Sequence, residues 1–245
     1  EKIKKTLPNI NYMFADCDRD YELSRALGFK GTYLGTFPGG GGYELNEYSN
    51  YIQSFEKRNE ILVKGYQGKL GRCNNVLEAL VNLKILLAPY NIFVFGASNE
   101  AIKKAKNLGL LEWKNFKITG KVKHKEVMKK MGEANIYIGN NISDGMPNTL
   151  LEAIVMGAFP IQSNPGGASA ELINHGQNGL LINDPENVDE IKELLKTILA
   201  DKDKQKAAID HNSKKIKPFL EREYITQQVL KKYKVIEDEL ISTYD

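Results

Sequence analysis

Cysteine, tryptophan and histidine are scarce in this sequence, which holds two, one and three of them among 245 residues. The two cysteines, Cys17 and Cys73, cannot build a disulfide framework and lack the paired spacing of a structural zinc site. Such sparse cysteine is typical of proteins from a reducing compartment. We therefore expect a cytoplasmic protein without a bound metal.

Neither sign of charge dominates, since 34 lysines and arginines face 31 aspartates and glutamates, for a net charge of +3. That excess is too small to indicate a nucleic-acid partner. No apolar run approaches the roughly 18 residues that span a bilayer, and no signal peptide is recognisable. We therefore expect neither a transmembrane segment nor nucleic-acid binding. A peripheral membrane position stays open for a full-length protein.

Two common nucleotide-binding fingerprints are missing as well. The glycine-rich run at residues 64–72 (KGYQGKLGR) does not fit G-x-x-x-x-G-K-[ST], which excludes an ATPase P-loop there. No G-x-G-x-x-G follows the first strand of the main β/α region, so a nicotinamide dehydrogenase is the least favoured of the functions considered.

What the sequence does contain is a regular alternation of short apolar runs and amphipathic segments after Arg58. This alternation predicts an α/β fold, a Rossmann-like, doubly wound parallel sheet. The expected strands are 61–63, 90–95, 116–119, 136–138, 159–162 and 180–182. The expected helices are 75–87, 100–108, 125–131, 149–157 and 188–200, followed by a charged helical tail from residue 201.

The region before this alternation is short and differently built. It reads as a strand at 10–16, a helix at 19–27, a strand at 32–36 and a flexible joint at the glycine run 39–42. Residues 1–57 are too few to bury a core of their own. Because the chain begins at Glu1 without methionine, we expect it to be a piece of a longer protein.

The most informative stretch is SDGMPNTLLEA, which begins at Ser143. It places Asp144 and Glu152 at either end of a turn that opens a helix. Free N–H groups and the positive end of the helix dipole attract phosphate there, and a carboxylate accepts hydroxyl groups of a sugar or ribose. Taken alone, the two acids could simply favour an exposed helix start. With the turn between them, they indicate a site for a nucleoside diphosphate sugar.

This stretch resembles the donor-binding signature of group 1 glycosyltransferases, the retaining family 4 with the GT-B fold. The resemblance continues through M-G-A-F-P-I, through Gly166, Gly167 and Glu171, and into N-G-L-L-I at 178–182. The first acid of the signature is usually glutamate, and here it is Asp144. The shorter side chain reaches about one methylene less, so the sugar contact is expected to be looser or to suit a different sugar.

The resemblance implies that the chain holds the second domain of a GT-B enzyme. Residues 1–57 would be a remnant of the N-terminal acceptor domain and the hinge, 58–220 the donor-binding domain, and 221–245 a helix crossing back. Glu152 would bind the ribose and Asp144 the transferred sugar. Backbone N–H groups from the turn and the helix start would face the sugar and its phosphate: Gly145, Met146, Pro147 (which has no N–H of its own), Asn148, Thr149 and Leu150.

Three further loops are candidates for donor contacts, each with a plain alternative. In the family, a basic pair grips the diphosphate after the first strand of the donor domain; Arg72 is the best match here, Lys69 the second and Lys64 a weaker one, beside Gly65. Lys121 and Val122 would read the base. Gly166 and Gly167 would approach the sugar. The alternatives are a solvated turn, an ordinary β/α turn and a turn that merely needs positive φ. We assign no role to His124 and expect His175, Trp113 and both cysteines to be structural.

Three functions therefore stay open. The first is the donor half of a retaining glycosyltransferase that moves a sugar from a UDP- or GDP-sugar to a hydroxyl acceptor in glycan or polysaccharide synthesis. It needs no cofactor, and a glycan or lipid-linked acceptor would be bound by the missing N-terminal domain. The second is a non-catalytic nucleotide-sugar-binding half of a split enzyme. The third is a sugar-nucleotide epimerase on the same architecture.

Overall fold

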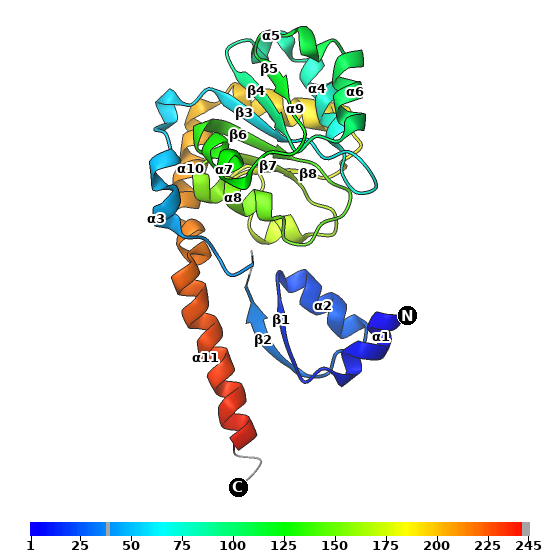
Figure 1. Cartoon of the computed structure of the whole chain (residues 1–245), viewed down its shortest axis with the longest axis vertical. Helices are drawn as coiled ribbons and strands as arrows, with labels where there is room; N and C mark the ends of the chain where they lie inside the picture. Colours follow the sequence, from blue (N-terminus) through cyan, green and yellow to red (C-terminus); the bar gives the residue numbers. More distant parts are fainter. Residues whose placement is uncertain (38–39, 242–245) are drawn as a thin grey trace.

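The computed structural model describes residues 1–37 and 40–241 (Figure 1). Pro38 and Gly39 lie outside the described residues, and with Gly39 so does the beginning of the glycine run expected to form a hinge. The described chain forms a larger unit around a six-stranded sheet and a smaller unit with two strands. The long C-terminal helix runs from the first past the second.

The larger unit confirms the predicted doubly wound sheet. Its strand order is β5-β4-β3-β6-β7-β8, and every neighbouring pair is parallel. Counted from β3, this is the Rossmann order 3-2-1-4-5-6, in which the winding reverses between β3 and β6. The strands are β3 (Glu60–Lys64), β4 (Asn91–Phe95), β5 (Phe116–Ile118), β6 (Ala134–Gly139), β7 (Phe159–Ser163) and β8 (Leu180–Ile182).

Alternating side chains of these strands build two cores, one on each face of the sheet. Ile61 and Val63 of β3 face one core, and Leu62 between them faces the other. The first core is covered by α4 (Cys73–Val81), α6 (Asn99–Asn107) and α9 (Val188–Leu199). The second is covered by α7 (His124–Glu133) and α8 (Asn148–Met156), while α10 (Lys202–Lys215) packs on α8 and α9. Burial on both faces explains the nearly continuous apolar strands.

The prediction of a single helix at 75–87 is wrong in one respect, because this segment forms two helices. Helix α4 ends at Val81, and the short α5 (Lys84–Leu87) follows. The Asn82 side chain donates to the carbonyl of Glu78 at 3.0 Å. Asparagine often ends a helix through such bonds to the backbone, and the apolar spacing alone did not reveal it.

The smaller unit consists of α1 (Lys2–Thr6), β1 (Tyr12–Ala15), α2 (Asp18–Ala26) and β2 (Thr32–Thr36), with a 3₁₀ turn at Leu7–Asn9. Strands β1 and β2 pair in parallel with α2 as their crossover. Figure 1 shows this unit below the carboxyl ends of the larger sheet, with α2 nearest to it. The expected strand–helix–strand pattern is therefore confirmed.

The connection after the glycine run lies on the larger unit. It contains α3 (Leu45–Tyr48) and 3₁₀ turns at Ser49–Tyr51 and Phe55–Lys57. Side chains from this connection pack against the core under α7 and α8. They are Leu45, Tyr48, Tyr51 and Ile52.

Helix α11 (Arg222–Ile241) follows a 3₁₀ turn at Lys217–Leu220 and runs past the smaller unit (Figure 1). The Tyr12 hydroxyl donates to Glu239 at 2.9 Å, and the rings of Phe14 and Tyr233 lie 5.7 Å apart. Both units are therefore tied to the same helix. Among the helices that the structure describes, none combines the length and apolarity required to cross a membrane.

Candidate functional site

The candidate site lies where β3 and β6 end side by side. Lys64 is the last residue of β3, and its Nζ lies 3.7 Å from Oδ2 of Asp144. The buried Asn141, just beyond β6, donates from Nδ2 to the same Asp144 oxygen at 2.8 Å. Its own N–H is held by Ser163 Oγ at 2.8 Å. In doubly wound sheets, ligands bind at such a reversal of strand order.

Helix α8 begins beside Asp144 with several unpaired backbone N–H groups. The N–H groups of Leu150 and Leu151 both donate to the carbonyl of Pro147, at 2.9 and 3.2 Å. The expectation that the Leu150 N–H faces a ligand is therefore wrong, because the first turn of the helix uses it. Within the described part of the chain, the following N–H groups have no hydrogen-bond partner: Gly145, Met146, Asn148 and Thr149.

Glu152 lies in the middle of α8 and is buried, with 8% of its surface exposed. His124, the first residue of α7, places Nε2 2.7 Å from Oε1 of Glu152. Burial raises the pKa of the Glu152 carboxyl above its ordinary value, while His124 and Lys64 act against that rise. Lys64 therefore lies near both acids of the signature. The sequence placed Lys64 last among the cations and gave His124 no role; the structure places both beside these acids.

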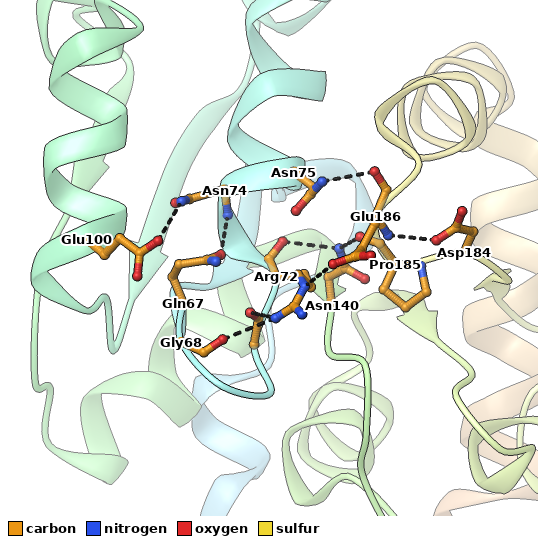
Figure 2. A network of polar contacts seen from close by, with 11 residues as sticks. Gln67, Gly68, Arg72, Asn74, Asn75, Glu100, Asn140, Asp184, Pro185 and Glu186 are labelled. Carbon is orange, nitrogen blue, oxygen red and sulfur yellow. Dashed lines mark hydrogen bonds and ion pairs between the residues drawn. The ribbon is translucent and has the colours of Figure 1, made fainter.

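The other two cations of the β3–α4 loop are placed differently (Figure 2). Arg72 donates from Nε to Glu186 at 2.8 Å, and from Nη1 to the carbonyls of Gly68 and Gly71 at 3.1 and 2.9 Å. These contacts commit most of its guanidinium to the protein. Lys69 is exposed on the same loop. Both stay predicted diphosphate contacts, but the structure brings Lys64 and not these two next to Asp144.

The loop that carries Arg72 is fastened to the loop that carries Asp144. The N–H of Arg72 donates to the carbonyl of Asn140 at 2.9 Å, and the side chain of Asn140 donates back to the Arg72 carbonyl at 3.1 Å (Figure 2). The N–H of Ile142 donates to Leu70 at 2.8 Å. Arg72 therefore shapes the site by holding two of its loops together.

Gly65 occupies a crowded position directly after Lys64. Its N–H donates to the carbonyl of Phe95 at 2.7 Å, and a Cβ there would lie 2.7 Å from the Cα of Ala97. Only glycine fits this approach of backbones. Packing alone therefore explains why a glycine stands at position 65. Its role in ligand binding stays a prediction.

The predicted base-reading loop joins β5 to α7. The side chain of Lys121 is exposed, and Val122 packs at the edge of the core beneath α7 and α8. In the described part of the chain, the backbone groups of Lys121 and Val122 make no hydrogen bond. They are thus free to bond a flat heterocycle, two residues before His124.

The loop with Gly166 and Gly167 has positive φ at both glycines, 79° and 94°. It lies next to the smaller unit. Arg19 of α2 donates from Nη1 to the carbonyl of Pro165 at 3.3 Å and to that of Asp144 at 2.8 Å. A residue more than a hundred positions away thus reaches the loops of the candidate site. No sequence signal pointed to Arg19, because nothing local marks it.

The arrangement combines groups that suit an anionic, hydroxyl-rich ligand. Lys64 and the unpaired N–H groups at the start of α8 provide positive potential for a diphosphate. Glu152 and Asp144 are hydroxyl acceptors on either side. Across the described residues, no group of three or more His, Cys, Asp or Glu side chains could hold a metal ion. Both cysteines are buried and unpaired.

This chain is similar to known proteins in sequence and in fold. It is 34% identical over 89 residues to the Vi polysaccharide biosynthesis protein VipC/TviE of Salmonella typhi, which covers 36% of this chain and 14% of that protein. The fold matches the pneumococcal O-GlcNAc transferase GtfA, in complex with UDP and GlcNAc, with a TM-score of 0.74 at 17% identity. It matches Anabaena Alr3699/HepE, in complex with UDP and glucose, with a TM-score of 0.74 at 14% identity.

These matches extend over 95% of this chain but only 47% and 65% of the two solved proteins. The chain thus spans about half to two thirds of the length of its structural relatives. The sequence model of the family glycosyl transferases group 1 matches residues 46–215, which is well over half of the chain. The chain therefore belongs to the group 1 glycosyltransferases, and its fold is that of their GT-B members.

Proposed function

We propose that this chain binds a nucleoside diphosphate sugar and forms the donor-binding part of a retaining glycosyltransferase. The observation that carries the proposal is the position of Lys64. It lies beside Asp144 and near enough to Glu152 to oppose the rise in that residue's pKa that burial causes, next to a helix start with unpaired N–H groups. A cation and a helix end flanked by two carboxylates fit a diphosphate between a ribose and a sugar.

Each part of the donor has a matching group. Glu152, held by His124, accepts the hydroxyls of the ribose. Lys64 and the N–H groups at 145–149 bind the diphosphate, and Asp144 accepts a hydroxyl of the transferred sugar. The free backbone at Lys121 and Val122 bonds the edge of the base.

The chemistry that these groups assist is departure of the nucleoside diphosphate. The bond between the anomeric carbon and the diphosphate oxygen breaks, and negative charge grows on that oxygen. Lys64 and the positive end of α8 stabilise this charge by preorganised electrostatics. The acceptor hydroxyl then bonds to the anomeric carbon on the face that the diphosphate left and gives its proton to the departing diphosphate oxygen, and the configuration is retained. The rest of a longer protein supplies the acceptor site.

The relatives support a choice of donor and pathway. GtfA and Alr3699/HepE were solved with UDP, which favours uridine over guanosine as the base. The Salmonella typhi relative acts in polysaccharide biosynthesis, which favours a glycan or lipid-linked acceptor. The buried, unpaired cysteines fit a reducing cytoplasm, at the membrane surface when the acceptor is lipid-linked.

Isothermal titration calorimetry of the 245-residue chain with UDP, GDP and ADP, in a chelating buffer, tests the proposal directly. We expect one of the three to bind at micromolar to millimolar concentration without a divalent ion. A chain that binds none of them, or binds only after a divalent ion is added, would contradict the proposal.

A second measurement separates transfer from binding alone. The described smaller unit contributes two strands, two short helices and a 3₁₀ turn, too little to form the opposite wall of a cleft that excludes water and orients an acceptor. We therefore expect the isolated chain to bind the donor without turning it over, and a longer parent protein to transfer the sugar. Chromatography of the incubated sugar nucleotide tests this, since an isomerised sugar would instead indicate an epimerase.

A further inference from the structure

An arginine from the smaller unit inserts between two loops of the donor site. Arg19 is the second residue of α2, and its Nη1 donates to the carbonyls of Asp144 and Pro165 at 2.8 and 3.3 Å. A Cβ on Gly166 would lie 3.1 Å from the same nitrogen. One guanidinium group therefore spans the loop that carries Asp144 and the loop that carries Gly166 and Gly167.

The rest of the Arg19 guanidinium is also committed within the protein. Asp20 Oδ1 accepts from Nε at 3.1 Å and from Nη2 at 2.8 Å. Four of the five N–H donors of an arginine are thus used on protein oxygen atoms. Its side chain is 22% exposed, so the fork is held in place by partly buried contacts. Arg19 is therefore placed to position loops and not to bind phosphate itself.

A residue of the larger unit, Glu171, in turn binds the start of α2. The carboxylate of Glu171 accepts the N–H of Asp18 at 2.8 Å and the N–H of Arg19 at 2.9 Å. The first N–H groups of a helix lack partners inside it, and a carboxylate there also interacts favourably with the helix dipole. Glu171 follows the Gly166–Gly167 loop by four residues, so both halves of the contact join α2 to the same part of the donor site.

We propose that Arg19 and Glu171 form a reciprocal clasp that sets the sugar-binding geometry of the donor site. Glu171 fixes the start of α2, and α2 then holds Arg19 between the Asp144 loop and the Pro165 loop. These two loops are the ones assigned to the transferred sugar. Among the groups assigned to the diphosphate, the Gly145 N–H shares its peptide unit with the Asp144 carbonyl that Arg19 binds. Lys64 and the start of α8 make no recorded contact with Arg19 or Glu171 in the described structure. This inference rests on the proposed function, which assigns these two loops to the transferred sugar.

The clasp predicts an effect that is selective for one part of the ligand. Removing Arg19 frees the backbone of Asp144 and Pro165 while leaving Lys64 and Glu152 in place. We expect Arg19→Ala to weaken binding of an intact sugar nucleotide about tenfold, the range of a hydrogen bond that involves a charged group, and binding of the bare diphosphate less than about twofold. A merely structural tether would weaken both ligands equally or neither.

The experiment compares four single variants of the 245-residue chain by calorimetry with UDP and UDP-glucose, and with GDP and GDP-mannose. Arg19→Ala removes the guanidinium group, and Arg19→Lys keeps the positive charge without that group. Glu171→Gln keeps one of the two acceptor oxygens of Glu171. Arg25→Ala is the matched control, because Arg25 is exposed on the same helix and its recorded contact is with the Tyr21 ring. We expect selective loss of the sugar nucleotide for the first three, the smallest for Glu171→Gln, and none for Arg25→Ala.

Hydrogen exchange of the unliganded chain provides a readout that needs no ligand. We expect Arg19→Ala to speed exchange in residues 141–147 and 164–170, with no change around β4 and α6 and a melting temperature within a few degrees of the original. If the unmodified chain binds no nucleotide, the proposed function fails while this arm still tests the clasp. Unchanged exchange in both loops, or equal loss of both ligands, would overturn the clasp itself.

Discussion

The Nε2 atom of His124 lies 2.7 Å from Oε1 of Glu152, which joins the first turn of α7 to the middle of α8. Glu152 is 8% exposed, whereas the His124 side chain is 59% exposed. The histidine therefore covers a buried carboxylate from the solvent side. It occupies one carboxylate oxygen and leaves the other for a ligand.

His124→Ala should weaken UDP binding by about three- to tenfold. Without the imidazole, the Glu152 carboxylate loses both an orienting hydrogen bond and an interaction that lowers its pKa. Its affinity for ribose hydroxyls should then fall, and the loss should grow as the pH drops. Calorimetry between pH 5 and 8 measures this, with Lys125→Ala, the next residue on α7, as control. A pH-independent loss would agree with the orienting bond alone and contradict the effect of His124 on the Glu152 pKa.

Glu152→Gln should lower the affinity for UDP and raise the stability of the folded chain at neutral pH. Because burial raises the pKa of Glu152 in the folded chain, its charged form is less favourable there than in the unfolded chain. The stability that this group contributes is full below its unfolded pKa and is lost as the pH rises through the folded value. The melting temperature of Glu152→Gln relative to the original chain should therefore rise from pH 4 to pH 7, while UDP affinity falls at pH 7. A difference that shrinks toward neutral pH would refute this sign.

Lys64→Met should weaken UDP and UDP-sugar alike, by about tenfold, because it removes the cation beside the helix start while keeping most of the stem. Lys69→Met removes an exposed cation of the same loop and should weaken both ligands less than Lys64→Met does, because the structure brings Lys64 and not Lys69 next to Asp144. Arg72→Met should mainly lower stability, by about 1 kcal/mol, because its bonds to Gly68 and Gly71 fasten the loop. Calorimetry and urea unfolding distinguish these outcomes. Strong loss of UDP binding with Arg72→Met alone would favour Arg72 over Lys64 as the main diphosphate contact.

Asn141→Ala should reproduce part of the effect of Asp144→Ala. Asp144→Ala is expected to spare bare UDP and to weaken the intact sugar nucleotide by about 1.5–3 kcal/mol, the worth of a hydrogen bond to a charged group. Asn141 holds the Oδ2 atom of Asp144 at 2.8 Å, so its loss should weaken the same ligand by a smaller amount. A double variant that loses no more than Asp144→Ala would confirm that Asn141 acts through Asp144. Additive losses would show a separate contact.

Two structural details at helix ends differ from what the sequence predicted. Apolar spacing predicted one helix at 75–87, and the turn at Asn82 divides it. The signature predicted ligand-facing N–H groups as far as Leu150, and the Leu150 N–H instead closes the first turn of α8. Each error concerns a hydrogen bond of a single residue, donated by the side chain of Asn82 in the first case and by the backbone of Leu150 in the second. Hydrophobic periodicity reports burial and does not report such bonds.

The sequence by itself determined the alternating strands and helices, and it determined the helix that carries Glu152 and the turn with Asp144 before it. Those features depend on periodicity and on residues close together in the chain. Only the tertiary structure decided which distant groups meet them. Lys64 reaches Asp144 because β3 pairs with β6, and His124 reaches Glu152 because α7 packs beside α8. Arg19 arrives from a separate unit, while Arg72 pairs with Glu186. Such partners are fixed by strand order and packing, which act between segments that no local pattern connects.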